Sequence, residues 1–366
     1  MQQNPKVLHF FLGTNTPQGF VSRFDQLGDP DADWRLYVIK GGPGSGKSTL
    51  MNKLASELSP LCKQVEFIHC ASDMASLDGV IFSDRKISVA DGTPPHAIEP
   101  KYPGAYENLV PVFDCWDHNA LYERRKEIVK ATKAVKHCHE YCTRFLTAAG
   151  SLLADTYRIA LEATDTDKIA RYAASFAARE FKRQTQGTPA ESVRFLSAVT
   201  DKGLHFFSQT AQQLCQHIYL IDDDYGAASR LLLMALRSHA MEAGYSVVTC
   251  YCPLAPFEKI DHLFIPQLGL GLMTTNRFHQ LDVKAERTIH ARRFTDTEKM
   301  KQRKKRIGFN LKGAAQMIDH ASSLLAEAKA KHDLLEALYI GAMDFGKLNK
   351  LTQKLTEQMR SDITGQ

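Results

Sequence analysis

The sequence predicts an α/β protein made of two similar units in tandem, each a parallel sheet followed by a long helical hairpin. Three observations predict this architecture. A glycine-rich loop lies between a strand-like and a helix-like segment, the second half of the chain repeats the first, and two long stretches have helical composition. These stretches, roughly residues 119–185 and 284–360, lack a sustained heptad, so we expect hairpins packed on or beside the sheets.

The strongest motif is residues 41–49, GGPGSGKST, which matches the phosphate-binding (P-loop, Walker A) pattern G-x-x-x-x-G-K-[ST]. Glycines let the backbone approach phosphate closely, and the N–H groups that open the next helix point at the anion. Lys47 is the expected catalytic cation on the β- and γ-phosphates, and Ser48 is an expected Mg²⁺ ligand. The flanks agree with this, because residues 35–39 are β-prone and residues 48–58 have apolar positions at helical spacing.

The motif therefore predicts P-loop NTPase-like units and the binding of a nucleoside triphosphate with Mg²⁺. Absence of a guanine-selecting N-K-x-D segment favours ATP. The expected binding residues are Gly41, Gly42, Pro43, Gly44, Ser45, Gly46, Lys47, Ser48 and Thr49.

An acidic residue at the end of a neighbouring strand is needed to complete the magnesium shell. Residues 86–91 (KISVAD) form an apolar segment ending in Asp91, and we assign Asp91 to the metal and to catalysis. Residues 217–224 (HIYLIDDD) compete for this assignment. The internal repeat favours Asp91, but it leaves open that Asp222 or Asp223 serves the first site from the second half.

The repeat aligns residues 36–39 with 218–221 at an offset of 182, and Asp165 with Asp344 at an offset of 179. It predicts four segments. They are a P-loop unit with an intact Walker A loop at 1–118, a helical hairpin at 119–190, a degenerate P-loop-like unit at 191–283 and a second hairpin at 284–366.

The loop of the second half is degenerate. It reads DDDYGAAS at 222–229, where Ala228 takes the place of Lys47 and Thr274 takes the place of Asp91. Three carboxylates lie where phosphates would approach, and like charges at that distance repel. We therefore expect the second unit not to bind a triphosphate.

Several segments resemble an uncharacterised family of bacterial tandem P-loop ATPases, which are described as nucleotide-kinase-like. The resemblance is carried by GGPGSGKSTL, LDGVIF, ISVADGTPPH, YPGAYENLV and HDLLEALYIGAMDF, and it is strongest at residues 41–110 and 332–345. It implies two P-loop units and ATP-dependent chemistry. The second half of that family often keeps a glycine–lysine loop, from which DDDYGAAS departs.

Three functions fit these observations. The preferred one is an ATPase whose nucleotide state is coupled to the helical arms or to a protein partner. The alternatives are a small-molecule or nucleotide kinase and an ATP-binding scaffold with negligible turnover. Motor-type ATPases commonly carry a water-activating Glu directly after the magnesium Asp, and its absence after Asp91 favours slow or kinase-like chemistry.

Other candidates have both a functional and a structural interpretation. His96 is either a γ-phosphate sensor or part of a turn, and Asp73 or Asp78 is either a general base or a helix cap. Residues 137–142 (HCHEYC) look like a metal cluster, but helical spacing favours packed thiols. The arginines that could stabilise a transition state are Arg85, Arg124, Arg125, Arg292 and Arg293.

Composition indicates a cytoplasmic protein. The net charge of +5 does not indicate nucleic-acid binding, and the basic run at 299–306 is interpreted as a solvated helix face, with a docking patch as the alternative. Eight cysteines without C-x-x-C spacing favour reduced thiols. No signal peptide and no membrane-spanning segment is predicted.

Overall fold

The computed structural model describes residues 4–185, 188–281 and 283–365. The chain divides into two compact units, each assembled from separate stretches of sequence. Unit 1 contains Met1–Gly13, Ser22–Tyr141 and Ser323–Gln366, and unit 2 contains Thr14–Val21 and Cys142–Ser322.

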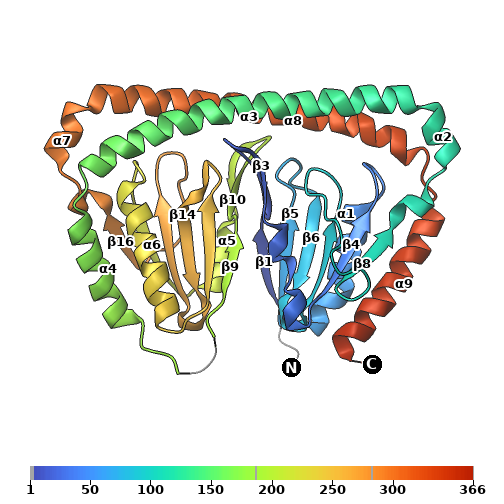
Figure 1. Ribbon diagram of the computed structural model, residues 1–366, viewed down its shortest axis with the longest axis horizontal. Helices are drawn as coiled ribbons and strands as arrows, with labels where there is room; N and C mark the ends of the chain where they lie inside the picture. Colours follow the sequence, from blue (N-terminus) through green and yellow to red (C-terminus); the bar gives the residue numbers. More distant parts are fainter. Residues whose placement is uncertain (1–3, 186–187, 282, 366) are drawn as a thin grey trace. The chain divides into compact units, whose positions relative to one another are not determined.

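Unit 1 is built on a six-stranded mixed sheet of order β1-β5-β6-β7-β4-β8 (Figure 1). All neighbouring strands are parallel except β6, which is antiparallel to both β5 and β7. The prediction of a parallel sheet is therefore correct only in part. Only four residues, 83–86, join β6 to β7, which is too short for the crossover that parallel neighbours need. The strands are β1 (Lys6–Phe10), β4 (Arg35–Lys40), β5 (Gln64–His69), β6 (Leu77–Phe82), β7 (Ile87–Asp91) and β8 (Glu107–Pro111).

Unit 2 has a six-stranded sheet of the same order and the same strand directions, β9-β13-β14-β15-β12-β16. The register also agrees, because Ile39 pairs with Asp91 in unit 1 and Ile221 pairs with Thr274 in unit 2. The internal repeat is thus present in the fold, and Thr274 is the counterpart of Asp91. The strands are β9 (Glu191–Arg194), β12 (His217–Asp222), β13 (Val247–Cys252), β14 (Ala255–Ile265), β15 (Leu270–Thr275) and β16 (Arg287–His290).

Two short hairpins, nine α-helices and seven short 3₁₀ helices complete the described part of the chain. The hairpins are β2–β3 (Gly13–Thr16, Gly19–Ser22) and β10–β11 (Ser197–Thr200, Gly203–Phe206). No helix among the described residues is long and apolar enough to span a membrane. The helices are α1 (Lys47–Leu58), α2 (His118–Glu123), α3 (Arg125–Glu162), α4 (Thr166–Glu180), α5 (Ser208–Leu214), α6 (Ala227–Glu242), α7 (Thr297–Gln302), α8 (Lys304–Ile340) and α9 (Phe345–Thr364).

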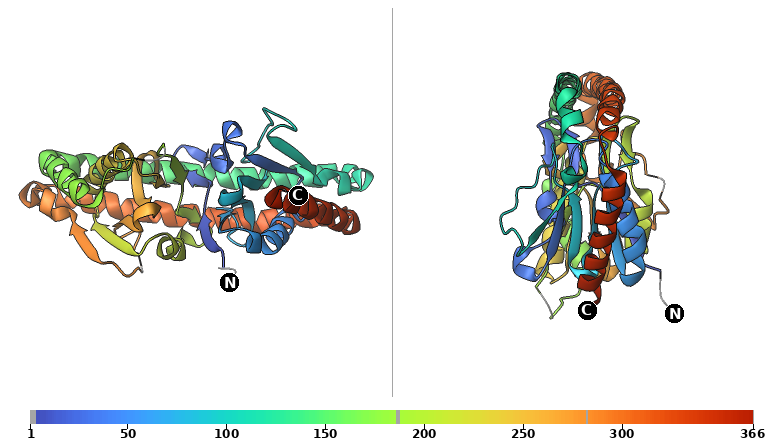
Figure 2. Two further views of the ribbon diagram at one scale, coloured as in Figure 1. Left: turned by 90° about the horizontal axis from the view of Figure 1, so that it is seen from below. Right: turned by 90° about the vertical axis from the view of Figure 1, so that its right-hand side faces the viewer.

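The two halves of the sequence exchange their last helices. The first half ends with α4, which packs in unit 2, and the second half ends with α9, which packs in unit 1. In unit 2, α4 packs against α6, and Phe176 and Leu236 belong to one hydrophobic core. In unit 1, α9 packs against α1, and Leu355 shares a core with Leu54. Figure 2 shows α9, in red at the C-terminus, lying against unit 1. Each half therefore supplies a helix that the other half's sheet needs to cover its apolar side chains.

Equivalent junctions lead into these two helices. The N–H of Asp165 donates to the carbonyl of Phe294, and the Asp165 carboxylate caps α4. The N–H of Asp344 donates to the carbonyl of Cys115, and the Asp344 carboxylate caps α9. The predicted offset of 179 residues between Asp165 and Asp344 is therefore confirmed.

Candidate functional site

The glycine-rich loop lies at the carboxyl end of β4 and leads directly into α1, as the sequence predicts. Gly44 and Gly46 have φ of 62° and 77°, a conformation that residues with a side chain rarely adopt. Gly46 is the N-cap of α1 and provides no side-chain cap. With no side-chain cap from Gly46, the first N–H groups of α1 can bind an anion, which the helix dipole favours.

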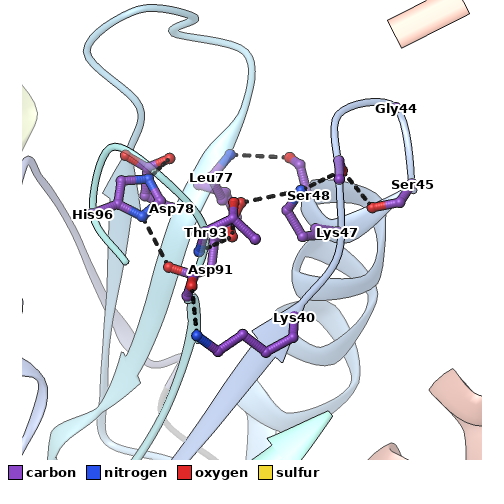
Figure 3. Close-up of polar contacts among 12 residues, drawn as sticks. Lys40, Gly44, Ser45, Lys47, Ser48, Leu77, Asp78, Asp91, Thr93 and His96 are labelled. Atoms are coloured by element: carbon purple, nitrogen blue, oxygen red, sulfur yellow. Dashed lines mark hydrogen bonds and ion pairs between the residues drawn. The ribbon is translucent and has the colours of Figure 1, made fainter. Parts of the chain in front are cut away.

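Lys47 and Asp91 face each other beside the loop (Figure 3). Parallel pairing of β4 and β7 brings the ends of the two strands together, and Lys47 Nζ lies 3.4 Å from Asp91 Oδ2. Lys47 Nζ also donates to the carbonyl of Gly42 at 2.6 Å. The other carboxylate oxygen of Asp91 accepts from the N–H and the hydroxyl of Thr93, at 3.0 and 2.6 Å. The structure thus brings together the two residues to which the sequence assigned catalysis.

Ser48 lies in the first turn of α1, and its hydroxyl accepts a hydrogen bond from Leu77 N–H at 3.0 Å. Ser45 is fully buried and donates to the carbonyl of Gly42 at 2.7 Å, which fixes the shape of the loop. The Ser48 hydroxyl and the Asp91 carboxylate offer oxygen atoms of the kind that Mg²⁺ prefers. The residues present therefore fit a magnesium ion.

His96 is buried beside Asp91. Its Nδ1 donates to the Asp91 carbonyl at 2.9 Å, its Nε2 lies 3.4 Å from Asp78 Oδ1, and its ring stacks on Phe24 at 4.6 Å. Burial lowers the pKa of His96, but the nearby carboxylates of Asp78 and Asp91 outweigh this, and the pKa is raised above its ordinary value. These contacts support the structural interpretation, in which His96 holds the turn that follows Asp91.

Two residues at the loop were not predicted. Glu336, on α8, accepts a hydrogen bond from Gly44 N–H at 3.2 Å. A Cβ atom on Gly44 would lie only 2.6 Å from the Glu336 carbonyl oxygen, so α8 packs directly against the loop. Lys40, the last residue of β4, donates to the carbonyls of Gly92 and Ile98. Sequence reasoning could not locate Glu336, because 292 residues separate it from Gly44.

The degenerate loop of unit 2 begins its helix as the intact loop does. Gly226 has φ of 74° and is the N-cap of α6, so Gly226 matches Gly46. Lys47 therefore corresponds to Ala227, one residue before the predicted Ala228. The strands before the two loops align at an offset of 182, and because residues 223–226 form a loop two residues shorter than 41–46, the helices after them align at an offset of 180. Whether Ala227 or Ala228 is aligned with Lys47, unit 2 has no lysine at this position.

The carboxylate of Asp223 fills the start of α6. It accepts from the N–H groups of Tyr225, Gly226 and Ser229, at 3.1, 3.0 and 2.8 Å. Asp222 pairs with His290, at 2.9 Å. The two aspartates that were alternatives for the first site thus have partners within unit 2.

The second unit also rearranges the charges of the first. Lys259 lies 2.7 Å from Asp261, the counterpart of Asp78, and its side chain borders Gly226. His279, the counterpart of His96, is buried, and burial lowers its pKa to about 4. The same residue types thus have different surroundings in the two units, because the pKa of His96 is raised and that of His279 is lowered.

The remaining candidates have local partners. Asp73 accepts from Ala75 N–H and pairs with Lys329. In the 137–142 segment, Cys138 and Cys142 are buried. Within the described ranges, the group that could hold a metal is instead His332, Asp333 and Glu336. The partners of four arginines are Leu61 O for Arg85, Glu127 for Arg124, Tyr122 for Arg125 and the Tyr172 ring for Arg293.

Compared with known proteins, the chain matches no family model, no curated protein and no solved structure. The resemblance to tandem P-loop ATPases therefore stays a prediction. What the site does has to be inferred from its own residues.

Proposed function

We propose that unit 1 binds ATP with Mg²⁺ at residues 41–49 and hydrolyses it. The observation that carries this proposal is the position of Lys47. It opens a helix with no side-chain cap and lies 3.4 Å from Asp91, at the end of the neighbouring parallel strand. A phosphate group would meet a lysine, free helix N–H groups and, through Mg²⁺, a carboxylate.

In this proposal the chain acts by positioning and electrostatics. Lys47 leaves the Gly42 carbonyl and contacts the β- and γ-phosphates, while Ser48 and Asp91 hold Mg²⁺. When bound, the ion neutralises charge on the phosphates. Backbone N–H groups of the loop hold the remaining phosphate oxygens in a fixed orientation.

Through Glu336, nucleotide binding at the loop would change a contact made by α8. A phosphate at the loop competes with the Glu336 carboxylate for Gly44 N–H, and the two anions repel each other. Binding therefore displaces the Glu336 side chain, and release allows it to return. The end of α8 is thus the element through which nucleotide state reaches the helical arms.

The test is ATP turnover with Mg²⁺ by the purified protein, alone and with pooled metabolites. Lys47→Ala should weaken ATP binding roughly 10- to 150-fold, since it removes a charge-assisted contact of about 1.5–3 kcal/mol. Lys53→Ala, an exposed lysine on the same helix, is the matched control and should bind normally. Undiminished ATP binding by Lys47→Ala would remove the site from residues 41–49.

The same assay separates the three functions. Lys47-dependent phosphate release without additives supports the ATPase. ADP formation only with the metabolite pool replaces it by a kinase. Binding without turnover under either condition leaves a nucleotide-binding scaffold.

A further inference from the structure

We propose that unit 2 carries a second ligand site, a cavity beside the degenerate loop that binds an uncharged, flat heterocycle such as a nucleoside. The cavity has a volume of about 570 Å³, within the range of small-molecule sites. Its wall includes Tyr157 of α3, Gly226, Arg230, Lys259 and His279. This inference concerns unit 2 alone and does not depend on ATP binding by unit 1.

The buried ions of the wall are already paired. Lys259 pairs with the buried Asp261 at 2.7 Å, and Arg230 pairs at 3.2 Å with Glu258, whose side chain is 72% exposed. The Asp223 carboxylate is bound by three backbone N–H groups. A charged ligand would enter a low-dielectric site whose buried charges are compensated, which costs free energy. The cavity therefore favours an uncharged ligand.

The wall also has unused hydrogen-bonding capacity. Ser197 and His279 are 1% and 5% exposed, and Ser197 Oγ and His279 Nε2 have no partner in the described part of the chain. Arg230 Nε is buried and likewise has none there. Buried polar atoms are ordinarily paired, so these atoms can serve a ligand that carries both donors and acceptors. Burial lowers the pKa of His279 to about 4, so its neutral ring offers one donor and one acceptor.

Aromatic side chains indicate a flat ligand. The Arg230 guanidinium lies over the Tyr157 ring, 4.1 Å from its centroid. Tyr157, Tyr225 and Phe278 line the cavity and pack against one hydrophobic cluster. Aromatic rings and guanidinium groups stack on flat heterocycles, and this stacking depends little on which heterocycle is bound.

The degenerate loop distinguishes a nucleoside from a nucleotide. No side chain caps the start of α1 at Gly46, whereas at the start of α6 the Asp223 carboxylate accepts from Tyr225 and Gly226 N–H in the loop and from Ser229 N–H in the first turn of the helix. A phosphate next to this carboxylate would be repelled. The 5′-phosphate should therefore weaken binding to unit 2, although it would strengthen binding to a P-loop.

The experiment is titration calorimetry with adenosine, guanosine, cytidine and uridine, each beside its 5′-monophosphate. The protein is the full chain with Lys47→Ala, so that unit 1 cannot contribute. We expect at least one nucleoside to bind, with an affinity at least about tenfold above that of its monophosphate. His279→Leu should weaken binding about tenfold by removing a hydrogen bond, and His279→Gln should weaken it less.

Cavity-filling variants test the location. Ala154→Phe adds a ring to the wall from α3 and should abolish binding. Ala148→Phe adds the same ring at an exposed position of the same helix outside the cavity, and it should bind normally. If Ala154→Phe does not fold by circular dichroism, Ser151→Phe fills the wall from an exposed position. Binding that survives the filled cavity, tighter binding of the monophosphates, or no binding of any nucleoside overturns the proposal.

Discussion

The carboxylate of Glu336 accepts a hydrogen bond from Gly44 N–H over 3.2 Å, so an acidic side chain from α8 faces the glycine-rich loop of unit 1. In unit 2, Asp223 places a carboxylate at the start of α6 from within the loop. The two carboxylates differ in how they can leave. Glu336 lies on another element and releases one N–H by rotating, whereas Asp223 would have to give up three N–H groups.

Glu336→Gln should tighten ATP binding by about 2- to 10-fold. The substitution keeps the shape of the side chain but removes the charge that opposes the phosphates. We expect the gain in binding free energy to be about that of one hydrogen bond. Calorimetric titration with Mg²⁺ and ATP measures it. Glu327→Gln, on the same helix but paired with Lys331, is the control and should leave the affinity unchanged. Equal affinities in wild type and Glu336→Gln would contradict competition at Gly44.

Asp91→Asn should abolish the gain in ATP affinity that Mg²⁺ provides. In EDTA, affinity should stay equal or rise, because Lys47 loses the carboxylate that holds it at 3.4 Å. The measurement is ATP titration with and without Mg²⁺. Asp84→Asn, in the turn between β6 and β7, is the control and should keep the metal effect. A full magnesium effect in Asp91→Asn would move the metal ligand elsewhere.

Asp223→Ala should destabilise unit 2 by about 1–3 kcal/mol, because it leaves buried N–H groups without an acceptor. It should also create an anion site, so inorganic phosphate should raise the melting temperature of this variant more than that of wild type. Circular dichroism melts in phosphate and in chloride provide the comparison. Asp224→Ala, which removes an exposed ion pair with Arg277, should show neither effect. Without a phosphate-specific gain, Asp223 does not occupy an anion site.

His96 should stabilise unit 1 at low pH. Its pKa is raised in the folded protein by Asp78 and Asp91 against the opposing effect of burial. The stabilisation is therefore complete below the unfolded value of about 6.5 and is lost as pH rises through the folded pKa. Both tryptophans, Trp34 and Trp116, belong to unit 1, so their fluorescence reports its unfolding. The difference in stability between wild type and His96→Gln should shrink as pH rises from 6 to 9.

His279 should act in the opposite direction. Burial lowers its folded pKa to about 4, so the unfolded chain takes up a proton first as pH falls from about 6.5. Unit 2 therefore loses stability between pH 6.5 and 4, and His279→Gln should lose less. Hydrogen exchange of amides in β14 and β15 measures this within unit 2. A loss that does not depend on His279 would show that other groups govern acid sensitivity.

Local patterns in the sequence predicted the loop and its flanks well. The strand before the loop and the helix after it begin and end within one residue of the prediction, because glycine and apolar spacing act over a few residues. The repeat correctly paired Asp91 with Thr274, since strand register carries the equivalence. The antiparallel strand β6 was missed, because its apolar run does not reveal its direction.

Contacts between segments far apart in the chain could not be predicted from the sequence. No local signal places Glu336 at Gly44, nor Lys259 beside Gly226, because these contacts depend on how distant segments pack. The same holds for α4 and α9, whose amphipathic patterns indicate that each covers a core but not which sheet it covers. The predicted loss of the second site was argued from repulsion among aspartates. The structure adds a feature that the sequence did not indicate, since the Asp223 carboxylate accepts from the N–H groups of Tyr225, Gly226 and Ser229 at the start of α6.

The contribution of α9 to the core of unit 1 sets an order of assembly during translation. All of unit 2 has been synthesised once residue 322 leaves the ribosome, whereas unit 1 still lacks Ser323–Gln366. Until those residues emerge, α1 has no α9 to cover it and the glycine-rich loop has no Glu336. The segment synthesised last thus completes the unit whose synthesis begins first. A ribosome that stops before α9 would release a chain whose second unit can fold and whose nucleotide-binding unit stays unfinished.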